Sequence, residues 1–346
     1  MRTEDVFLFV KRFLIFILAS IVFIVILSLP LAKGGNKLSE DKLNNNITYN
    51  MKPDNIVTIK EIKVKVYRDK TKKIEEMSLE DYIKGVVASE MPAEFHIEAL
   101  KAQAVAARTY AVTHIKSLGG SGCSKDKNAD ICDTVHCQAF MDKSDRMSAW
   151  PKEKGNYYWS KIEEAVNSTK GQVLKYNGEV VKGAYYFAIS SGKTEDVKDV
   201  FSTSLPYLKS VESPGEEIAP KYKSTSIYSY SKLASIINKY FDKSIVSSSS
   251  LKTNIKIKSK TEAGGVKEIQ IGNRTLKGSE FRSMLGLNST NFVIGFGKKD
   301  IQIVCTGYGH GVGMSQWGAN VYAKGGKSYN EILTHYYQGV KIEQIN

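Results

Sequence analysis

A glutamate just before a proline is the first feature of this sequence that could carry chemistry. Glu90 lies in Val87–Pro92 (VASEMP), which we interpret as the C-terminal end of a helix. The negative end of the helix dipole and the apolar neighbours both disfavour a carboxylate, so they would raise the pKa of Glu90. A carboxyl group that keeps its proton near neutral pH can act as a general acid. The same residues also suit an ordinary exposed glutamate at a helix end.

The next candidate is an arginine among small residues. Arg108 lies in Ala104–Tyr110 (AVAARTY), part of an alanine-rich stretch that predicts a second helix. Its guanidinium group could bind a substrate hydroxyl or steady the carboxyl of Glu90. Alternatively, Arg108 is a surface residue whose aliphatic part covers an apolar helix face.

A glycine-rich run near the C-terminus is the third candidate. The segment Gly307–Ala319 (GYGHGVGMSQWGA) begins with four glycines in seven residues and leads into a predicted helix. Backbone N–H groups at such a helix start can bind an anion or face a developing negative charge. His310 and Gln316 could contact substrate from this run. Its spacing matches neither a P-loop nor a dinucleotide-binding fingerprint.

Cysteines and a histidine cluster in the polar stretch after the alanine-rich helix. Thiolates and an imidazole in one loop can hold a tetrahedral zinc ion. A disulfide is an alternative in an exported protein, and free thiols are another, because the spacing is not that of a standard zinc finger. The candidate metal ligands are Cys123, Cys132, His136 and Cys137. Cys305 is distant in sequence, and we interpret it as a small buried residue at a strand end.

Helices and strands must position these residues. A capping pattern at Ser78 predicts a helix that stops at Pro92, and the alanine-rich helix should run from near His96 to about Leu118. Turn signals predict two hairpins, and a strand should precede the glycine-rich loop. The hairpin turns are Asn177-Gly178, whose second arm is Glu179–Phe187, and Gly272-Asn273. The strand is Ile301–Cys305. Further helices are predicted at Tyr158–Ser168, Lys232–Phe241 and Tyr329–Tyr337. Because helices and strands mix without regular alternation, we predict an α+β fold of helices and antiparallel strands around a substrate cleft.

The N-terminal part predicts a membrane anchor. Residues 13–32 contain no charged side chain, and a run of that length can cross a bilayer as a helix. A secretory signal peptide would have a shorter apolar region and a small-residue cleavage site, which Leu29–Lys33 fits poorly. We therefore predict a cytoplasmic tail (1–12), a single transmembrane helix (13–32), a flexible linker (33–55) and an extracytoplasmic domain (56–346).

The overall charge narrows the choice of partners. The formal net charge of +13 favours anionic partners such as wall polymers or lipid head groups. No basic block is interleaved with aromatic residues, so we do not expect nucleic acid to be a partner.

Three segments together resemble the stage II sporulation protein D family: Val87–Tyr110, Ser190–Glu195 and Gly309–Ala319. The resemblance covers nearly all of the chain after residue 56, and the run GHGVGMSQ is its most specific part. Similar members are lytic transglycosylases that degrade peptidoglycan as the mother-cell membrane engulfs the forespore. The resemblance therefore implies an enzyme anchored in that cell membrane, with peptidoglycan glycan strands as substrate and the companion sporulation proteins P and M as partners.

The resemblance also implies roles for single residues. Glu90 matches the catalytic acid of the family, and Arg108 matches a substrate-stabilising arginine. Tyr207 would be a tyrosine of the cleft, and Ser191 would contact substrate. Residues 188–192 read AISSG where the family often has a histidine and two glycines, so this chain departs from the pattern in that loop.

The same resemblance bears on the metal and on the reaction. The loop around Cys132 and His136 is similar to that of clostridial members, some of which bind zinc there, so a structural zinc ion is expected and no cofactor for the chemistry. Glu90 alone would protonate the glycosidic oxygen and then take the proton of the sugar's C6 hydroxyl, which closes a 1,6-anhydro ring, whereas glycoside hydrolases usually need two carboxyl groups. The alternatives are a non-enzymatic enhancer of a wall amidase, a hydrolase built on Cys305 and His310, and a structural tether between membrane and wall.

Overall fold

The computed structural model describes residues 61–201 and 203–345. The predicted tail (1–12), transmembrane helix (13–32) and linker (33–55) lie outside these residues. In the part of the chain that is described, no helix combines the length and the apolar character that crossing a membrane requires. Helices and small, mostly antiparallel sheets make up this part, which confirms the α+β class.

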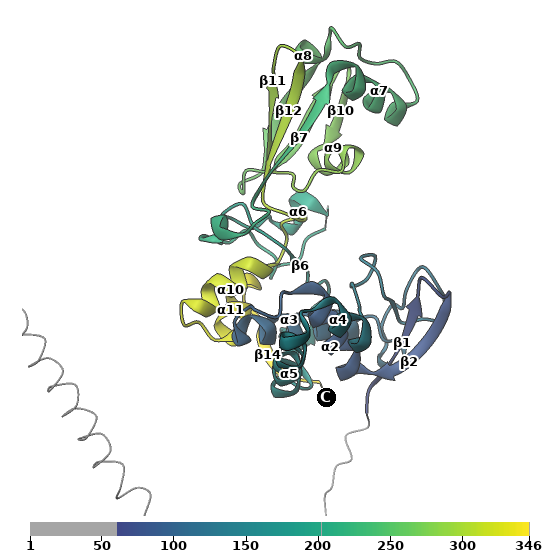
Figure 1. Ribbon diagram of the computed structural model, residues 1–346, viewed down its shortest axis with the longest axis vertical. Helices are drawn as coiled ribbons and strands as arrows, with labels where there is room; N and C mark the ends of the chain where they lie inside the picture. Colours follow the sequence, from purple (N-terminus) through teal and green to yellow (C-terminus); the bar gives the residue numbers. More distant parts are fainter. Residues whose placement is uncertain (1–60, 202, 346) are drawn as a thin grey trace, which may run out of the picture. The chain divides into compact units, whose positions relative to one another are not determined.

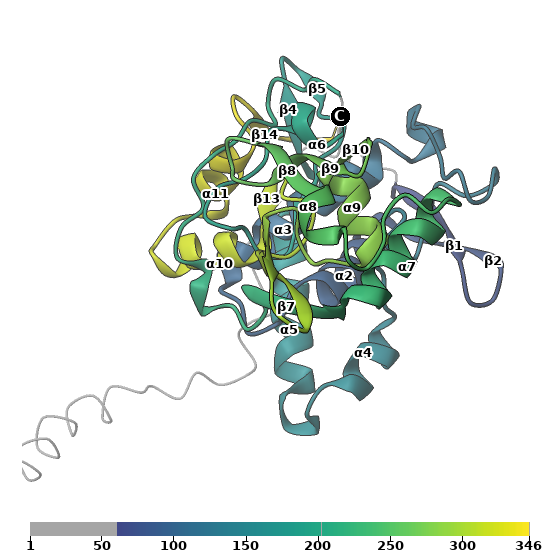
Figure 2. The ribbon, with the colours of Figure 1, turned by 90° about the horizontal axis from the view of Figure 1, so that it is seen from above.

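The first hydrophobic core surrounds α3 (Ile97–Val112). Every alanine of α3 is fully buried, and these small side chains let neighbouring elements approach closely. Figures 1 and 2 show α3 enclosed by the helices of this core. Its neighbours are α2 (Leu79–Glu90), α5 (Lys152–Ser168), β4 (Gln172–Tyr176), α10 (Gln316–Lys324) and α11 (Tyr329–Tyr336).

Helix α2 begins and ends where the sequence predicts. The Ser78 hydroxyl accepts a hydrogen bond from the Asp81 amide at 3.1 Å and so caps the first turn. The helix ends at Glu90, and Met91 is extended. Pro92 explains this end, because the residue before a proline is driven out of the helical region.

The alanine-rich helix is shorter than predicted. It ends at Val112, and the prediction that it continues to about Leu118 is wrong. The His114 amide donates to the Ala111 carbonyl at 2.9 Å, which is a tighter turn than the helix makes. A side chain at position 120 would collide with the backbone of His114, so Gly120 lets the chain fold back at this point.

The second core is built from two three-stranded antiparallel sheets and the helices that pack with them. Strand β12 (Asp300–Thr306) pairs antiparallel with both β7 (Lys223–Ser229) and β11 (Phe292–Phe296), and Figure 1 shows the three side by side. The remaining elements of this core are α7 (Tyr230–Phe241), α8 (Leu251–Asn254), β8 (Ile255–Lys260), β9 (Val266–Ile271), β10 (Arg274–Lys277) and α9 (Gly278–Leu285). The predicted hairpin at Gly272-Asn273 is the β9–β10 turn, and the predicted Ile301–Cys305 strand is β12.

Two further pairings matter for the site. Asn177 and Gly178 both have positive φ angles, 52° and 84°, as the predicted two-residue hairpin between β4 and β5 (Glu179–Val180) requires. The predicted continuous strand from Glu179 to Phe187 is wrong, because β6 (Tyr186–Phe187) is separate and pairs in parallel with β13 (Met314–Ser315). This pairing joins the start of α10 to the middle of the chain.

The short elements complete the described part. They are β1 (Lys63–Arg68), β2 (Lys73–Ser78), η2 (Lys116–Leu118), β3 (Ile131–Cys132), α4 (Lys143–Ala149), α6 (Val197–Val200), η3 (Glu216–Ile218) and β14 (Lys341–Gln344). Strand β3 pairs in parallel with β1, which anchors the cysteine-bearing loop on the β1–β2 hairpin.

Candidate active site and metal centre

Glu90 ends α2 with its carboxyl group held by two uncharged donors. Gln316 Nε2 donates to one carboxyl oxygen at 3.1 Å, and the Ala139 amide donates to the other at 3.3 Å. Gln316 is the first residue of α10, to which the glycine-rich loop leads. The structure therefore brings together Glu90 and Gln316, which lie 226 residues apart in sequence.

A layer of uncharged polar side chains extends this site. Gln316 also donates to Gln103 Oε1 at 3.5 Å. Gln138 Nε2 donates to the Tyr186 hydroxyl at 2.9 Å, and the Tyr82 hydroxyl donates to Gln138 Oε1 at 3.3 Å. Sequence reasoning missed these residues because each lies on a different element, and the only local signal was that a glutamine directly follows the cysteine cluster.

The surroundings of Glu90 favour its protonated form. Burial raises the pKa of Glu90 above its ordinary value, and the hydrogen bonds from Gln316 and Ala139 offset only part of this rise. Neither donor carries a charge, so neither provides the strong stabilisation that a nearby cation gives to a carboxylate. The geometry therefore suits a general acid that holds a proton near neutral pH.

The glycine-rich loop places His310 among aromatic rings. The rings of Tyr185, Phe187 and Phe201 lie 6.1, 5.7 and 5.4 Å from the imidazole, centre to centre. The Val312 amide donates to His310 Nδ1 at 3.1 Å, so the neutral ring carries its proton on Nε2. Burial lowers the pKa of His310 to about 4, and the ring is therefore neutral at physiological pH.

Ser191 and His310 line a small cavity together with Glu195 and Asn291. Asn291 Nδ2 donates to Ser191 Oγ at 3.0 Å. The cavity measures about 10 Å³, roughly the space of one water molecule. Glu90 is not among its lining residues, so the structure does not bring Ser191 and Glu90 into one cavity.

Arg108 is placed differently from the prediction. Its side chain is fully buried, and it binds Glu80 through Nε at 3.0 Å and Nη2 at 2.6 Å. Its other N–H groups donate to the carbonyl oxygens of Ala104, Val166 and Gln172. These partners use the guanidinium group inside the first core, and none of them is Glu90, so the structure does not bring Arg108 to that carboxyl. A contact of Arg108 with substrate stays a prediction.

Tyr207 is also a core residue in this structure. Its side chain is 6% exposed, its hydroxyl donates to the Lys182 carbonyl at 2.7 Å, and its ring lies 5.4 Å from that of Tyr176. The hydroxyl is thus already satisfied by backbone. The structure thus places Tyr207 in the first core, and its role in a cleft stays a prediction.

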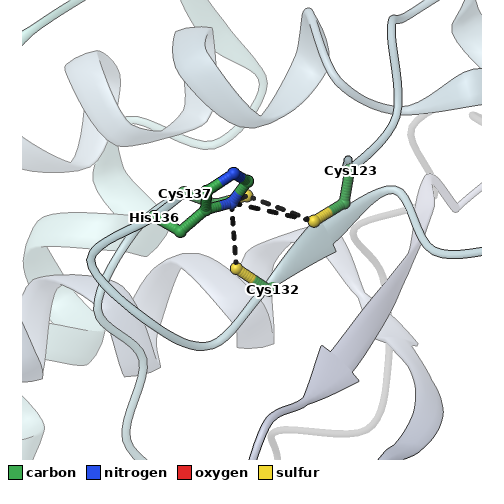
Figure 3. A group of neighbouring side chains, drawn as sticks. All are labelled: Cys123, Cys132, His136 and Cys137. Atoms are coloured by element: carbon green, nitrogen blue, oxygen red, sulfur yellow. Dashed lines mark hydrogen bonds between the residues drawn. The ribbon is translucent and has the colours of Figure 1, made fainter. Parts of the chain in front are cut away.

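The cysteine–histidine cluster is assembled, as Figure 3 shows. Its four candidate ligand atoms lie within 4.8 Å of one another. His136 Nδ1 is 3.9, 3.5 and 3.3 Å from the sulfur atoms of Cys123, Cys132 and Cys137. The sulfur atoms of Cys123 and Cys137 are 3.6 Å apart, and all of these cysteines are free thiols.

This geometry fits a zinc ion. With Zn–S near 2.3 Å and Zn–N near 2.0 Å, tetrahedral ligand atoms lie roughly 3.5 to 3.8 Å apart, close to the separations in the cluster. Ser124 Oγ lies 3.0 Å from His136 Nε2, and a proton held there leaves Nδ1 free to bind metal. Burial opposes ionisation of Cys132, but hydrogen bonds, chiefly those from Thr134, lower its pKa to about 7, which favours the thiolate that a metal needs.

The cysteine-bearing loop runs directly into the Glu90 site. Gln138 and Ala139 follow Cys137 in sequence, and they supply the donor to Tyr186 and the amide donor to Glu90. The position of this loop therefore affects the position of two groups around the carboxyl.

Other cavities and nucleophiles lie away from Glu90. Cavities of about 410 and 420 Å³ are lined by residues around Lys161 and around His335, and neither includes Glu90. Cys305 is 1% exposed, its thiol contacts the Ser289 carbonyl, and burial raises its pKa. These contacts do not support the hydrolase alternative, which needs an ionised Cys305 beside His310.

Comparison with known proteins points to one family. The family described as stage II sporulation protein (SpoIID) matches residues 67–176. The chain is 38% identical over 288 residues to stage II sporulation protein D of Bacillus subtilis (strain 168), which covers 82% of this chain and 80% of that one. It is 38% identical over 291 residues to the protein of the same name from Bacillus amyloliquefaciens, with 84% and 81% covered. The amidase enhancer of Bacillus subtilis (strain 168) is 31% identical over 309 residues, which cover 75% of this chain and 40% of the enhancer.

Proposed function

Because this chain belongs to the stage II sporulation protein D (SpoIID) family, we propose that it is a lytic transglycosylase of sporulation. Its substrate would be peptide-stripped glycan strands of peptidoglycan, cut between N-acetylmuramic acid and N-acetylglucosamine during engulfment of the forespore. The observation that carries this proposal is the Glu90 carboxyl, which is largely buried and held by the uncharged donors Gln316 and Ala139.

One carboxyl group is enough for this reaction. Glu90 would give its proton to the glycosidic oxygen as the bond breaks, and it would then be a carboxylate. That carboxylate would take the proton of the C6 hydroxyl as this oxygen attacks the anomeric carbon, which closes a 1,6-anhydro ring without adding water. Gln316 and Ala139 would stabilise the carboxylate between the two steps, because both donate hydrogen bonds to it.

The test is the identity of the product. The purified full-length chain would be incubated in detergent with insoluble, peptide-stripped peptidoglycan. The masses of the released sugars would be measured by mass spectrometry. We expect products that end in 1,6-anhydro-N-acetylmuramic acid, and none from Glu90→Gln. Products heavier by one water would indicate a hydrolase, and binding without release would indicate a tether or an enhancer.

A second candidate function follows from one relative. The similarity to a protein named amidase enhancer allows the alternative that this chain binds and stimulates a wall amidase without cutting glycan. An enhancer has no need of a protonated carboxyl at the end of α2. Two results together would favour this alternative. Glu90→Gln would stimulate an amidase as strongly as the wild type does, and neither protein would release sugar.

We further propose that Cys123, Cys132, His136 and Cys137 hold a structural zinc ion. When bound, the ion would cross-link the loop that carries Ala139 to β3, and it would take no part in bond breaking. The support is the spacing of the ligand atoms described above.

The setting of the protein in the cell is also a proposal. The apolar segment 13–32 would anchor the chain in the membrane with its N-terminus in the cytoplasm, because Lys11 and Arg12 precede it. The catalytic part would then face the wall, where its glycan substrate and the companion sporulation proteins P and M would lie.

A further inference from the structure

A second buried glutamate organises the segment that carries Gln316. Glu216, the first residue of η3, is 1% exposed. Its carboxyl group accepts hydrogen bonds from the Ser213 hydroxyl at 2.6 Å, the Ser315 hydroxyl at 2.6 Å and the Ser190 amide at 2.8 Å. Three donors on separate segments of the chain therefore converge on one carboxyl.

Ser315 links this carboxyl to the Glu90 site. The Ser315 hydroxyl donates to Glu216, and the same oxygen accepts a hydrogen bond from the Gly318 amide at 3.3 Å, so Ser315 is the N-cap of α10. The next residue, Gln316, donates to Glu90. The rotation of the first turn of α10 thus decides whether the Gln316 amide reaches the Glu90 carboxyl.

The packing around Glu216 leaves little freedom for this turn. A Cβ atom at position 318 would lie 2.1 Å from the Tyr336 hydroxyl and 2.6 Å from Glu216 Oε1, so only glycine lets α10 come this close. The Tyr336 hydroxyl is 2.6 Å from Ser213 Oγ. The hydroxyl groups of Tyr336 and Ser213 can therefore donate in series toward the carboxyl.

Given the proposed function, we infer that Glu216 is a positioning residue, which holds Gln316 on Glu90 through its hydrogen bonds to Ser315 and Ser190. The buried carboxyl has a cost, because burial raises the pKa of Glu216 to about 7 despite its hydrogen-bond donors. A buried acid of this kind is often kept where it serves a site. No direct contact between Glu216 and substrate is needed for this role.

The role has a signature that loss of stability alone would not produce. The hydrogen bond from Gln316 lowers the pKa of Glu90, against the larger effect of burial. If Gln316 is displaced, the pKa of Glu90 must rise further. The alkaline limb of the pH–rate profile then moves to higher pH, while turnover falls because the carboxylate loses a donor.

The test compares two variants with a matched control in the full-length chain. In Glu216→Gln, a side-chain N–H group replaces one of the carboxyl oxygens that accept hydrogen bonds from Ser190, Ser213 and Ser315. Ser315→Ala removes the hydroxyl group that links Glu216 to α10. Ser328→Ala removes the N-cap of α11, so it matches the loss of a helix cap and leaves Gln316 alone. The first readout is the titration midpoint of the Glu90 carboxyl, which is followed by ¹³C NMR and assigned with Glu90→Gln. The second readout is kcat and KM for soluble peptide-free glycan fragments.

We expect both variants to raise the Glu90 midpoint and to lower kcat about tenfold with KM unchanged, and Ser328→Ala to do neither. An unchanged Glu90 midpoint in both variants, or an equal shift in Ser328→Ala, would overturn the inference. The NMR midpoint needs no turnover. If the wild type releases no sugar, the proposed function fails, and the midpoint still decides whether Glu216 positions Gln316.

Discussion

The two ends of helix α2 carry glutamates in opposite electrostatic settings. Glu80, in the first turn, faces the guanidinium group of Arg108, with separations of 3.0 and 2.6 Å, and the Gly171 amide donates to it as well. Glu90, the last residue, accepts hydrogen bonds from the uncharged groups of Gln316 and Ala139, and no other donor reaches it from residues 61–201 or 203–345. One helix therefore holds one carboxyl by charge and the other by neutral donors.

The two ends of α2 therefore suit different roles. The ion pair with the buried Arg108 guanidinium fixes the position of Glu80, which suits a structural contact. A buried carboxyl without a cation retains its proton more easily, which suits proton transfer. We therefore expect changes in activity to follow Glu90 and changes in stability to follow Glu80.

Exchanging each glutamate for glutamine should separate the two roles most strongly. Glu90→Gln cannot supply the proton, so glycan cleavage should fall by about 10²- to 10⁴-fold with no loss in the free energy of unfolding. Glu80→Gln should lower the free energy of unfolding by about 3 kcal/mol, because it leaves Arg108 buried without its counter-charge. Sugar release and urea unfolding of both variants measure the two effects.

The control is a double variant that also removes the unpaired charge of Arg108. Adding Arg108→Met to Glu80→Gln should recover part of the lost stability, since an apolar side chain of similar length replaces an unpaired buried cation. A large loss of cleavage in Glu80→Gln, measured where the variant is still folded, would contradict the division between the two ends of α2.

Much of this arrangement could be predicted from local sequence. The cap at Ser78 and the stop at Pro92 define α2, and the glycine-rich run leads into a helix that begins at Gln316, as expected. The cysteine cluster was also predictable, because its members lie within 15 residues and share one loop. Patterns of this kind depend on neighbours in sequence.

The partners of the charged residues could not be predicted in the same way. Arg108 resembles a surface or substrate-binding residue in its alanine-rich context, and its partner Glu80 lies 28 residues earlier on another helix. Glu216 has little local signal, since only Ser213 is near it in sequence, and its other donors, Ser190 and Ser315, lie 26 and 99 residues away. Packing of remote elements decides such contacts, and one sequence does not reveal it.

Metal removal should loosen the Glu90 end of α2 and leave the Glu80 end intact. If zinc binds the cluster of Cys123, Cys132, His136 and Cys137, an excess of metal of about 100 times its dissociation constant stabilises the fold by about 2.7 kcal/mol. A chelator should therefore lower the thermal midpoint, and added zinc should restore it. Hydrogen exchange at the Ala139 amide should rise in parallel.

Cys305→Ala is the matched control for the metal. This cysteine lies in the second core, away from the cluster, so the chelator effect should persist in the variant. The chelator effect should disappear in Cys132→Ala. A wild-type thermal midpoint that the chelator does not change would count against the zinc proposal.

The pH dependence should also divide the two glutamates. Burial holds the pKa of Glu90 above its ordinary value of 4.5, so the protonated form persists at higher pH and cleavage falls about tenfold per pH unit once that pKa is passed. The alkaline limb should be unchanged in Glu80→Gln. An alkaline limb at or below the ordinary glutamate pKa would contradict the assignment of Glu90 as the acid.

The same pKa shift has a consequence for stability. Because the folded-state pKa of Glu90 is raised, its stabilising contribution is fully present below about pH 4.5 and is lost as the pH rises through the folded-state pKa. Glu90→Gln has no such group. The wild type should therefore lose stability relative to Glu90→Gln over this pH range, which urea unfolding at several pH values measures.

A substitution at Tyr207 tests whether this predicted cleft residue belongs to the core. Tyr207→Phe removes the hydrogen bond to the Lys182 carbonyl and keeps the ring packed near Tyr176. We expect the free energy of unfolding to fall by about 1 kcal/mol, and cleavage by the folded variant to stay at the wild-type rate. Tyr186→Phe is the matched comparison, because that hydroxyl accepts the hydrogen bond of Gln138 beside Glu90. If Tyr207→Phe reduces cleavage more than Tyr186→Phe does, Tyr207 acts on substrate, and the boundary between core and active site must be redrawn.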